Sequence, residues 1–218
     1  MECVVKVKFS CGVLVSVLFS AMSAHAADGG EIMVKGYILP AACHINFSNS
    51  GAIDYGRIPS SDLHQDEPTD LPEKQAVFSI DCDSKARIGL NVTDEVSGTA
   101  MDGGVAGGNP DANAKYGLGL SGEHKIGAYT MYVEDVIADG ESGFDMLSST
   151  TTEGWVNNPQ GSVVQGYNLS WGHNNSPVAS KSVSGSVKVL AALNSLKELP
   201  VQEEVNINGL ATFEIVYL

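Results

Sequence analysis

Alternation of apolar and polar residues marks the two ends of the chain. Over Val205–Leu218 the odd positions are apolar or glycine and most even positions are polar, with Leu210 as the exception. A period of two over this length is typical of a strand with one buried face. A second alternating segment is Glu31–Leu39. With the preceding glycine, its apolar face carries Gly30, Ile32, Val34, Gly36 and Ile38.

The sequence between these ends predicts further short strands separated by turns. Besides a short run around Cys43, the candidate strands are 52–58, 76–82, 88–92, 116–120, 126–136, 167–171 and 186–193. The segments 61–74 and 98–111 are rich in polar residues, glycine or proline, and we expect loops there. The segment 139–158 is mostly polar. Convincing helical periodicity is missing from the sequence after residue 26. Many short strands in one domain favour an all-β fold, a β-sandwich.

The first 26 residues have the pattern of a secretory signal peptide. Lys6 and Lys8 precede the apolar segment Phe9–Met22, and Ala24-His25-Ala26 is a small-x-small cleavage site. The alternative interpretation is an uncleaved anchor, for which the apolar segment is short. We expect cleavage before Ala27, which leaves 218 − 26 = 192 residues as one exported domain without direct membrane insertion.

The charge of the chain narrows its possible partners. Twelve Lys and Arg residues stand against 26 Asp and Glu residues, a net charge of −14. Such a surface repels both nucleic acid and anionic membranes, so we expect neither as a partner.

Two cysteines, Cys43 and Cys82, remain after the signal peptide. A single pair in an exported protein is most simply one disulfide. It would close a loop worth about 4 kcal/mol in the chain-entropy model. The alternative is a pair of metal ligands, but the chain has no Cys-x-x-Cys and its histidines show no ligand spacing. We expect a disulfide, and no metal or cofactor.

Motifs that carry catalysis are weak in this sequence. Residues 117–122, Gly-Leu-Gly-Leu-Ser-Gly, match G-x-G-x-x-G but lack the strand–turn–helix context that places a pyrophosphate at a helix N-terminus. A G-x-S-x-G nucleophile elbow is absent from the sequence. The sequence therefore does not predict an enzyme.

The two ends and the cysteine spacing resemble the pilin subunits of the chaperone–usher pathway. In that family an alternating strand with a V/I-x-G-x-V/I core precedes the first cysteine, as Val34-Lys35-Gly36-Tyr37-Ile38 precedes Cys43 here. The family's second cysteine is matched by Cys82, and its C-terminal alternating strand has a penultimate aromatic residue, here Tyr217. The chain is similar to a divergent, β-fimbrial branch of these subunits.

This resemblance implies an immunoglobulin-like β-sandwich over residues 41–218 that lacks one strand and is completed by a donor strand. Residues 27–40 would be the donor extension, with Gly30, Ile32, Val34, Gly36 and Ile38 as the donor row. The strand that lines the acceptor groove and binds the chaperone would carry Gly209, Ala211, Phe213, Ile215 and Tyr217. The implied partners are a periplasmic chaperone, an outer-membrane usher and neighbouring subunits in a head-to-tail polymer. The subunit would pass through the periplasm to the cell surface.

Three functions remain open at this point. The first is a structural fimbrial subunit that polymerises by donor-strand exchange and supports adhesion. The second is a monomeric periplasmic protein of the same fold whose N-terminal strand fills its own groove, with an unknown binding role. The third is a sugar-binding tip adhesin or a secreted enzyme, although a tip adhesin normally lacks a donor strand. The first and second functions both require the alternation over 31–39, so this pattern does not separate them.

Overall fold

The computed structural model of the protein describes residues 32–37 and 42–218. The chain divides into two units, Met1–Ile38 and Leu39–Leu218. The predicted signal peptide and the donor-row residues Gly30 and Ile38 lie outside the described residues. Residues 32–37 form no strand, although alternation predicts one over Glu31–Leu39. A single strand needs a ladder partner to be stable, and alternation alone does not supply one.

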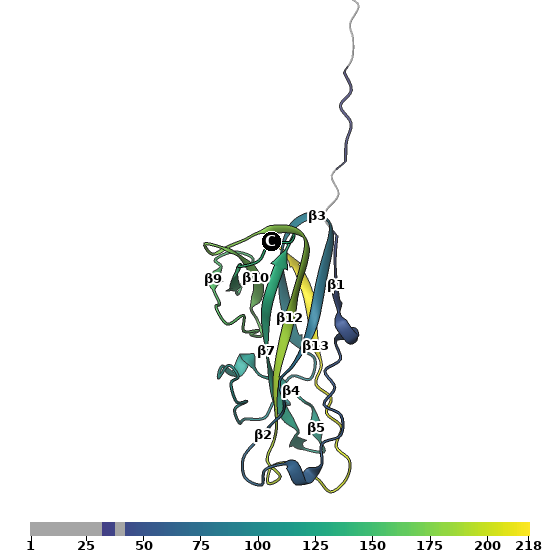
Figure 1. Cartoon of the computed structure of the whole chain (residues 1–218), viewed down its shortest axis with the longest axis vertical. Helices are drawn as coiled ribbons and strands as arrows, with labels where there is room; N and C mark the ends of the chain where they lie inside the picture. The colour runs from purple at the N-terminus through teal and green to yellow at the C-terminus, as the bar shows by residue number, and fades with distance from the viewer. Residues whose placement is uncertain (1–31, 38–41) are drawn as a thin grey trace, which may run out of the picture. The chain divides into compact units, whose positions relative to one another are not determined.

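Residues 42–218 fold mainly into antiparallel strands, so the predicted all-β class is confirmed (Figure 1). The strands are β1 (Cys43–Phe47), β2 (Thr69–Asp70), β3 (Lys74–Asp94), β4 (Tyr116–Gly117), β5 (Leu120–Ser121), β6 (His124–Lys125), β7 (Gly127–Ala138), β8 (Asp145–Ser149), β9 (Val156–Asn157), β10 (Asn168–His173), β11 (Ser176–Pro177), β12 (Ala179–Leu193) and β13 (Ala211–Tyr217). The described residues also contain the short 3-10 helices η1 (Ser48–Gly51), η2 (Ser60–Asp62) and η3 (Ala112–Ala114). In the described part of the chain, none of the helices has the length and apolarity needed to cross a membrane.

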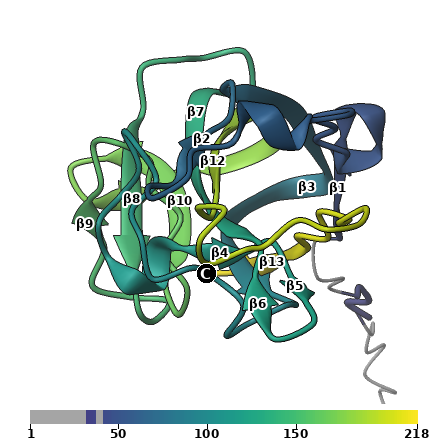
Figure 2. The same ribbon diagram turned by 90° about the horizontal axis from the view of Figure 1, so that it is seen from below.

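The long strand β3 belongs to both layers of the sheet. Its first half pairs with β1 and β12, and its second half pairs with β10 and β13. From there the sheet continues through β7 and β4 on one side and through β8 and β9 on the other. Figure 2 shows β7 and β12 in one layer and β8 and β10 in the other. The eleven-stranded sheet is thus curled over one core, an arrangement consistent with a β-sandwich.

Apolar side chains from both halves of β3 fill the space between the layers. Ile80 and Leu90 are 0% and 1% exposed, and Trp171 of β10 is 1% exposed. The predicted strands 76–82 and 88–92 are confirmed, but they form one strand. Their connection stays in the ladder because Ala86 and Arg87 still pair with β12.

Several predicted boundaries are wrong. Ala52–Ile58 is extended but pairs with nothing in the described chain, and the C-terminal strand begins at Ala211 rather than Val205. The expected loop 61–74 contains β2, and the mostly polar segment 139–158 contains β8 and β9. In β8 only Leu147 is a fully buried apolar residue, so its strand is fixed by pairing with β10 rather than by its own pattern.

The glycine-rich segment 98–111 is confirmed as a loop, and it packs against the sheet. Met101 and Val105 are buried together with Ala128 of β7 and Ala192 of β12. The loop therefore covers an apolar patch on these two strands and is a fixed part of the fold.

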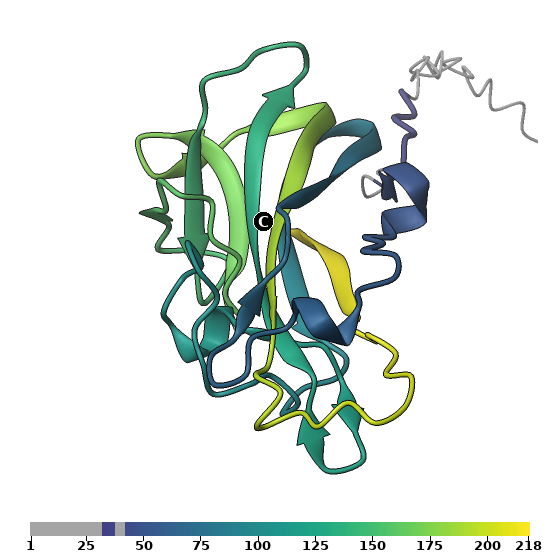
Figure 3. The same ribbon diagram turned by 60° about the horizontal axis from the view of Figure 1, so that its bottom comes forward.

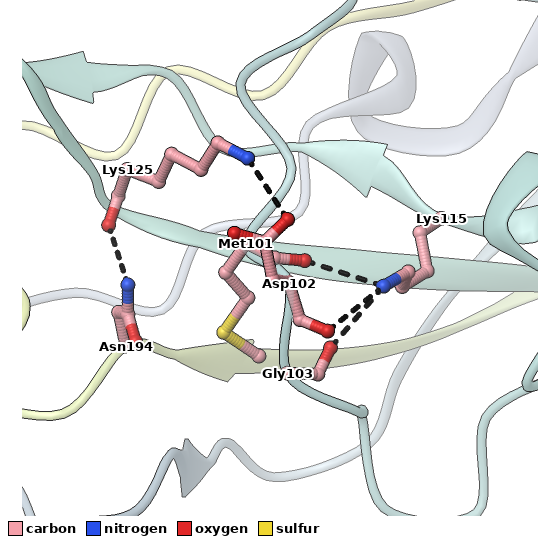
Figure 4. A network of polar contacts seen from close by, with 6 residues as sticks. All are labelled: Met101, Asp102, Gly103, Lys115, Lys125 and Asn194. Carbon is pink, nitrogen blue, oxygen red and sulfur yellow. Dashed lines mark hydrogen bonds and ion pairs between the residues drawn. The ribbon is translucent and has the colours of Figure 1, made fainter.

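Two lysines hold this loop in place (Figure 4). The Lys115 ammonium donates to the carbonyl oxygens of residues 101–103 over 3.3–3.4 Å. The Lys125 ammonium lies 3.2 Å from the Asp102 carboxylate, and the Asn194 amide donates to the Lys125 carbonyl. The ammonium groups of both lysines therefore bind this loop.

The Cys43–Cys82 disulfide joins β1 to β3, as the sequence predicts. It closes a loop of 39 residues in sequence separation. We expect Cys43→Ala/Cys82→Ala to lower the free energy of unfolding by about 4 kcal/mol, because the unfolded chain regains the entropy of that loop. Urea denaturation of the two mature proteins measures the difference. An unchanged midpoint and slope would contradict it.

Asp139 holds the irregular start of β12. Its carboxylate accepts backbone N–H groups from Lys181 and Ser182, each at 2.9 Å, and lies 2.8 Å from the Lys85 ammonium. The hydrogen bond from Lys85, followed by the two backbone amides, lowers the pKa of Asp139 from 3.8 to about 2.

Because this pKa is lower in the folded protein, the stabilisation from Asp139 is complete above pH 4 and is lost as the pH falls towards 2. We expect Asp139→Asn to lower the Tm at pH 6, and the difference from wild type to shrink between pH 4 and pH 2. Thermal melts followed by circular dichroism measure this, with Asp66→Asn on an exposed loop as the control. A difference that persists at pH 2 would show that the charge is not its source.

Candidate functional site

In the described part of the chain, the outer edge of β13 has no strand beside it. Within residues 42–218, β13 pairs with β3 alone. The Leu210 carbonyl accepts the Glu95 amide, and the Leu218 amide donates to the Arg87 carbonyl. The even-numbered residues of this strand therefore use their backbone groups on β3. By the alternation of antiparallel ladders, the outward backbone groups are those of Ala211, Phe213, Ile215 and Tyr217.

Strand β1 has an open edge of the same kind. In the described part of the chain it pairs with β3 alone. The Asp83 amide donates to the Ala42 carbonyl, so the even-numbered residues of β1 face β3. The backbone groups of Cys43, Ile45 and Phe47 then point to the other side. Figure 3 shows β13 in yellow at the edge of the sheet, with the chain that continues from β1 beside it.

The inward side chains of these two edges are only half-buried. They are Phe213 and Ile215 on β13, and Ile45 and Phe47 on β1, all packed against the edge of the core. Core residues on the paired strands are buried almost completely. The two edges therefore leave a band of apolar surface on this side of the domain, beside backbone groups that pair with no strand in the described residues.

Two contacts connect the edges directly. The Cys43 amide donates to the Tyr217 hydroxyl at 2.8 Å. The rings of Phe47 and Phe213 meet edge to face with centroids 5.1 Å apart. At these levels β1 and β13 lie close together.

Further along, a cavity of about 550 Å³ opens between two extended segments, 53–58 and 201–207. Their half-buried apolar residues alternate with exposed polar ones, in the same manner as on β13. The apolar members are Ile53, Tyr55, Ile58, Val201, Val205 and Ile207. Three carboxylates and one guanidinium surround the cavity, from Asp54, Glu203, Glu204 and Arg57. The groove, defined here as the two strand edges and this cavity, is apolar inside and acidic at its rim.

A second cavity of about 440 Å³ is mainly polar. Lys188 lies there over the ring of Tyr132 and forms an ion pair with Glu134. The hydrogen bond to Glu134 raises the pKa of Lys188, which favours the charged ammonium. In the described part of the chain, clusters of three or more His, Cys, Asp or Glu able to hold a metal are not found.

The structure brings most of the predicted C-terminal row together on one strand. Ala211, Phe213, Ile215 and Tyr217 all lie on β13, whereas Gly209 precedes it. A Cβ at Gly209 would lie 2.9 Å from the Tyr129 ring, so only glycine fits there without a shift. In the described segment 32–37, the side chains of Ile32 and Val34 are 94% and 91% exposed, and Gly36 lies in the same segment.

Sequence reasoning missed the opposite side of the groove. Ile45 and Phe47 follow the first cysteine, and their alternation was too short to interpret. The segments 53–58 and 201–207 carry the same period of two as a strand, but they line the cavity without joining a ladder.

Comparison with known proteins gives two matches. Residues 32–130 match a family model described as a protein of unknown function, DUF1120. The chain is also 26% identical over 144 residues to the uncharacterized protein YhcF of Escherichia coli strain K12. That alignment spans 60% of this chain and 60% of the relative.

Amide hydrogen exchange tests the open edge. We expect the amides of Phe213 and Ile215 to exchange much faster than those of Glu214 and Val216, because only the even-numbered amides donate to β3. NMR exchange on the uncomplexed mature protein measures this alternation. Equal protection along β13 would mean that its outer edge is paired.

Proposed function

We propose that the protein is a structural subunit of a chaperone–usher pilus, which polymerises by donor-strand exchange and supports adhesion. In this proposal residues 42–218 are an immunoglobulin-like sandwich without its final strand. The missing strand comes from residues 30–38 of a neighbouring copy. The observation that carries the proposal is the pair of open strand edges flanked by half-buried apolar rows.

The N-terminal extension can supply the backbone groups and apolar side chains that would complete the groove. An extended segment supplies backbone donors and acceptors to an open edge, and alternate side chains enter the apolar band. Burying Ile32, Val34 and Ile38 is worth about 5 to 9 kcal/mol before the cost of ordering the segment. The backbone ladder adds to this.

Donation from one copy to the next gives an open polymer. The donor segment and the groove are different surfaces, so the contact is heterologous and does not close. Following the resemblance, a periplasmic chaperone would cover the same groove during transit, and the exchange would take place at an outer-membrane usher. Export through the inner membrane would use the predicted signal peptide, residues 1–26.

A gel of unheated fibres tests the proposal. The mature protein is exported with its chaperone and usher and loaded in SDS without boiling. We expect a ladder of multimers that collapses on heating, because strand-complemented contacts are buried and slow to open. Val34→Asp should abolish the ladder, since it places a carboxylate in the apolar row.

Met33→Asp is the matched control, because it adds the same charge one position away, on the other face of the alternating segment. Its ladder should persist. A ladder from Val34→Asp would show that the donor row is assigned wrongly. A single folded monomer without chaperone would instead favour the self-complemented periplasmic protein.

A further inference from the structure

We propose that Lys35 of one copy pairs with Glu214 of the next, and that this pair sets the register and direction of the donated strand. The inference rests on the proposed function. In the register that it assigns, the donated strand runs antiparallel to β13. Gly36 then lies opposite Phe213, and Lys35 lies opposite Glu214.

The size of the side chains selects this register. Phe213 is the largest apolar side chain of the inward row, and its ring already contacts Phe47 across the groove. A side chain placed opposite Phe213 would have to displace one of these rings, whereas Gly36 brings none. The same register places Ile38 opposite Ala211, the smallest member of the row, so at these two positions a large residue meets a small one. Val34 and Ile32 then lie opposite Ile215 and Tyr217.

The charges select the same register independently. Lys35 is the only Lys or Arg between residues 27 and 56. Glu214 is exposed on the outer face of β13 and takes part in none of the ion pairs within residues 42–218. Once Gly36 faces Phe213 in an antiparallel pair, Lys35 faces Glu214 without further adjustment.

The alternating direction of the backbone groups along β13 makes the position of Lys35 and Glu214 effective for a charged pair. The backbone groups of Phe213 point to the open edge, so residues 36 and 213 form a hydrogen-bonded pair. Residues 35 and 214 then form a non-hydrogen-bonded pair, where side chains are closest. Opposite charges stabilise such a pair, and like charges destabilise it.

A parallel strand fits the groove less well. With Lys35 again beside Glu214, it would bring Val34 to Phe213 and Gly36 to Ile215. A branched side chain would then meet the aromatic contact, and the glycine would lie beside Ile215, which takes no part in that contact. The antiparallel direction is therefore the one that both features favour.

Disulfide capture tests the direction. The probe is a synthetic peptide of residues 27–41 with Met33→Cys, added to the mature protein carrying either Val216→Cys or Thr212→Cys. In the antiparallel register residue 33 lies opposite 216, with Cα atoms about 4.5 Å apart, within reach of a disulfide. In the parallel register residue 33 lies beside 212. We expect capture by Val216→Cys only, seen as a mass shift under non-reducing conditions.

Capture by Thr212→Cys instead would overturn the direction, and capture by both or by neither would overturn the register. The native Cys43–Cys82 bond stays formed in both variants, so each carries one free thiol in the groove region. Unmodified peptide bound by the same variants, followed by fluorescence anisotropy, shows that each groove still accepts a strand.

Uptake kinetics test the charge. At about 20 mM salt we expect the Lys35→Glu peptide to enter the groove about fivefold more slowly than the wild-type peptide, because a rim charge acts mainly on the association rate. Protein with Glu214→Lys should restore the rate of that peptide and slow the wild-type peptide. At about 500 mM salt the differences should vanish, since the Debye length falls below about 5 Å. Asp66→Lys makes the same charge change on an exposed loop and is the control.

The outcomes separate the inference from the proposed function. Equal uptake of the wild-type and Lys35→Glu peptides at low salt would overturn the charged pair and leave donor-strand exchange standing, provided that a Val34→Asp peptide is excluded. If the wild-type peptide itself is not taken up, the proposed function and the inference fall together.

Discussion

An antiparallel strand inside a sheet has two neighbours, and β13 has one among the residues described. The alternating direction of its backbone groups determines what could take the place of the second neighbour. Ala211, Phe213 and Ile215 point their backbone groups to the open edge, and their side chains are half-buried. Backbone groups that point to the open edge and half-buried apolar side chains both recur at every second residue. A helix or an irregular loop could cover the apolar row but could not satisfy the ladder, so the matching cover is another strand.

The width of the groove is set by β3, which holds both of its edges. One edge, β1, is paired with the first half of β3 and tied to it by the Cys43–Cys82 disulfide. The other edge, β13, is paired with the second half. Since β3 passes continuously from one layer to the other, the edges cannot separate without breaking this ladder. The disulfide thus holds in place the edge that has only five residues of pairing.

Sequence predicted what depends on local alternation and missed what depends on neighbours. The strands that carry Ile80, Leu90 and the C-terminal row were found because each has several apolar residues at a period of two. Strand β8 was missed, since only Leu147 marks its buried face and β10 supplies the rest. A period of two also predicted a strand over 52–58. That prediction is wrong, because Ile53 and Tyr55 line a cavity and do not pair in a ladder. Alternation reports one buried face, and it does not report whether a partner strand exists.

An open apolar edge is also a hazard, because it can pair with the same edge of another copy. Charge opposes that outcome here. Two β13 edges placed side by side in the antiparallel register centred on residue 214 would bring Glu214 against its own counterpart. Glu203 and Glu204, which line the cavity, add negative charge on the same side of the domain. A strand that carries Lys35 beside its apolar row escapes this penalty. The acidic rim would therefore slow edge-to-edge association, whereas it would not oppose a strand that carries a positive charge.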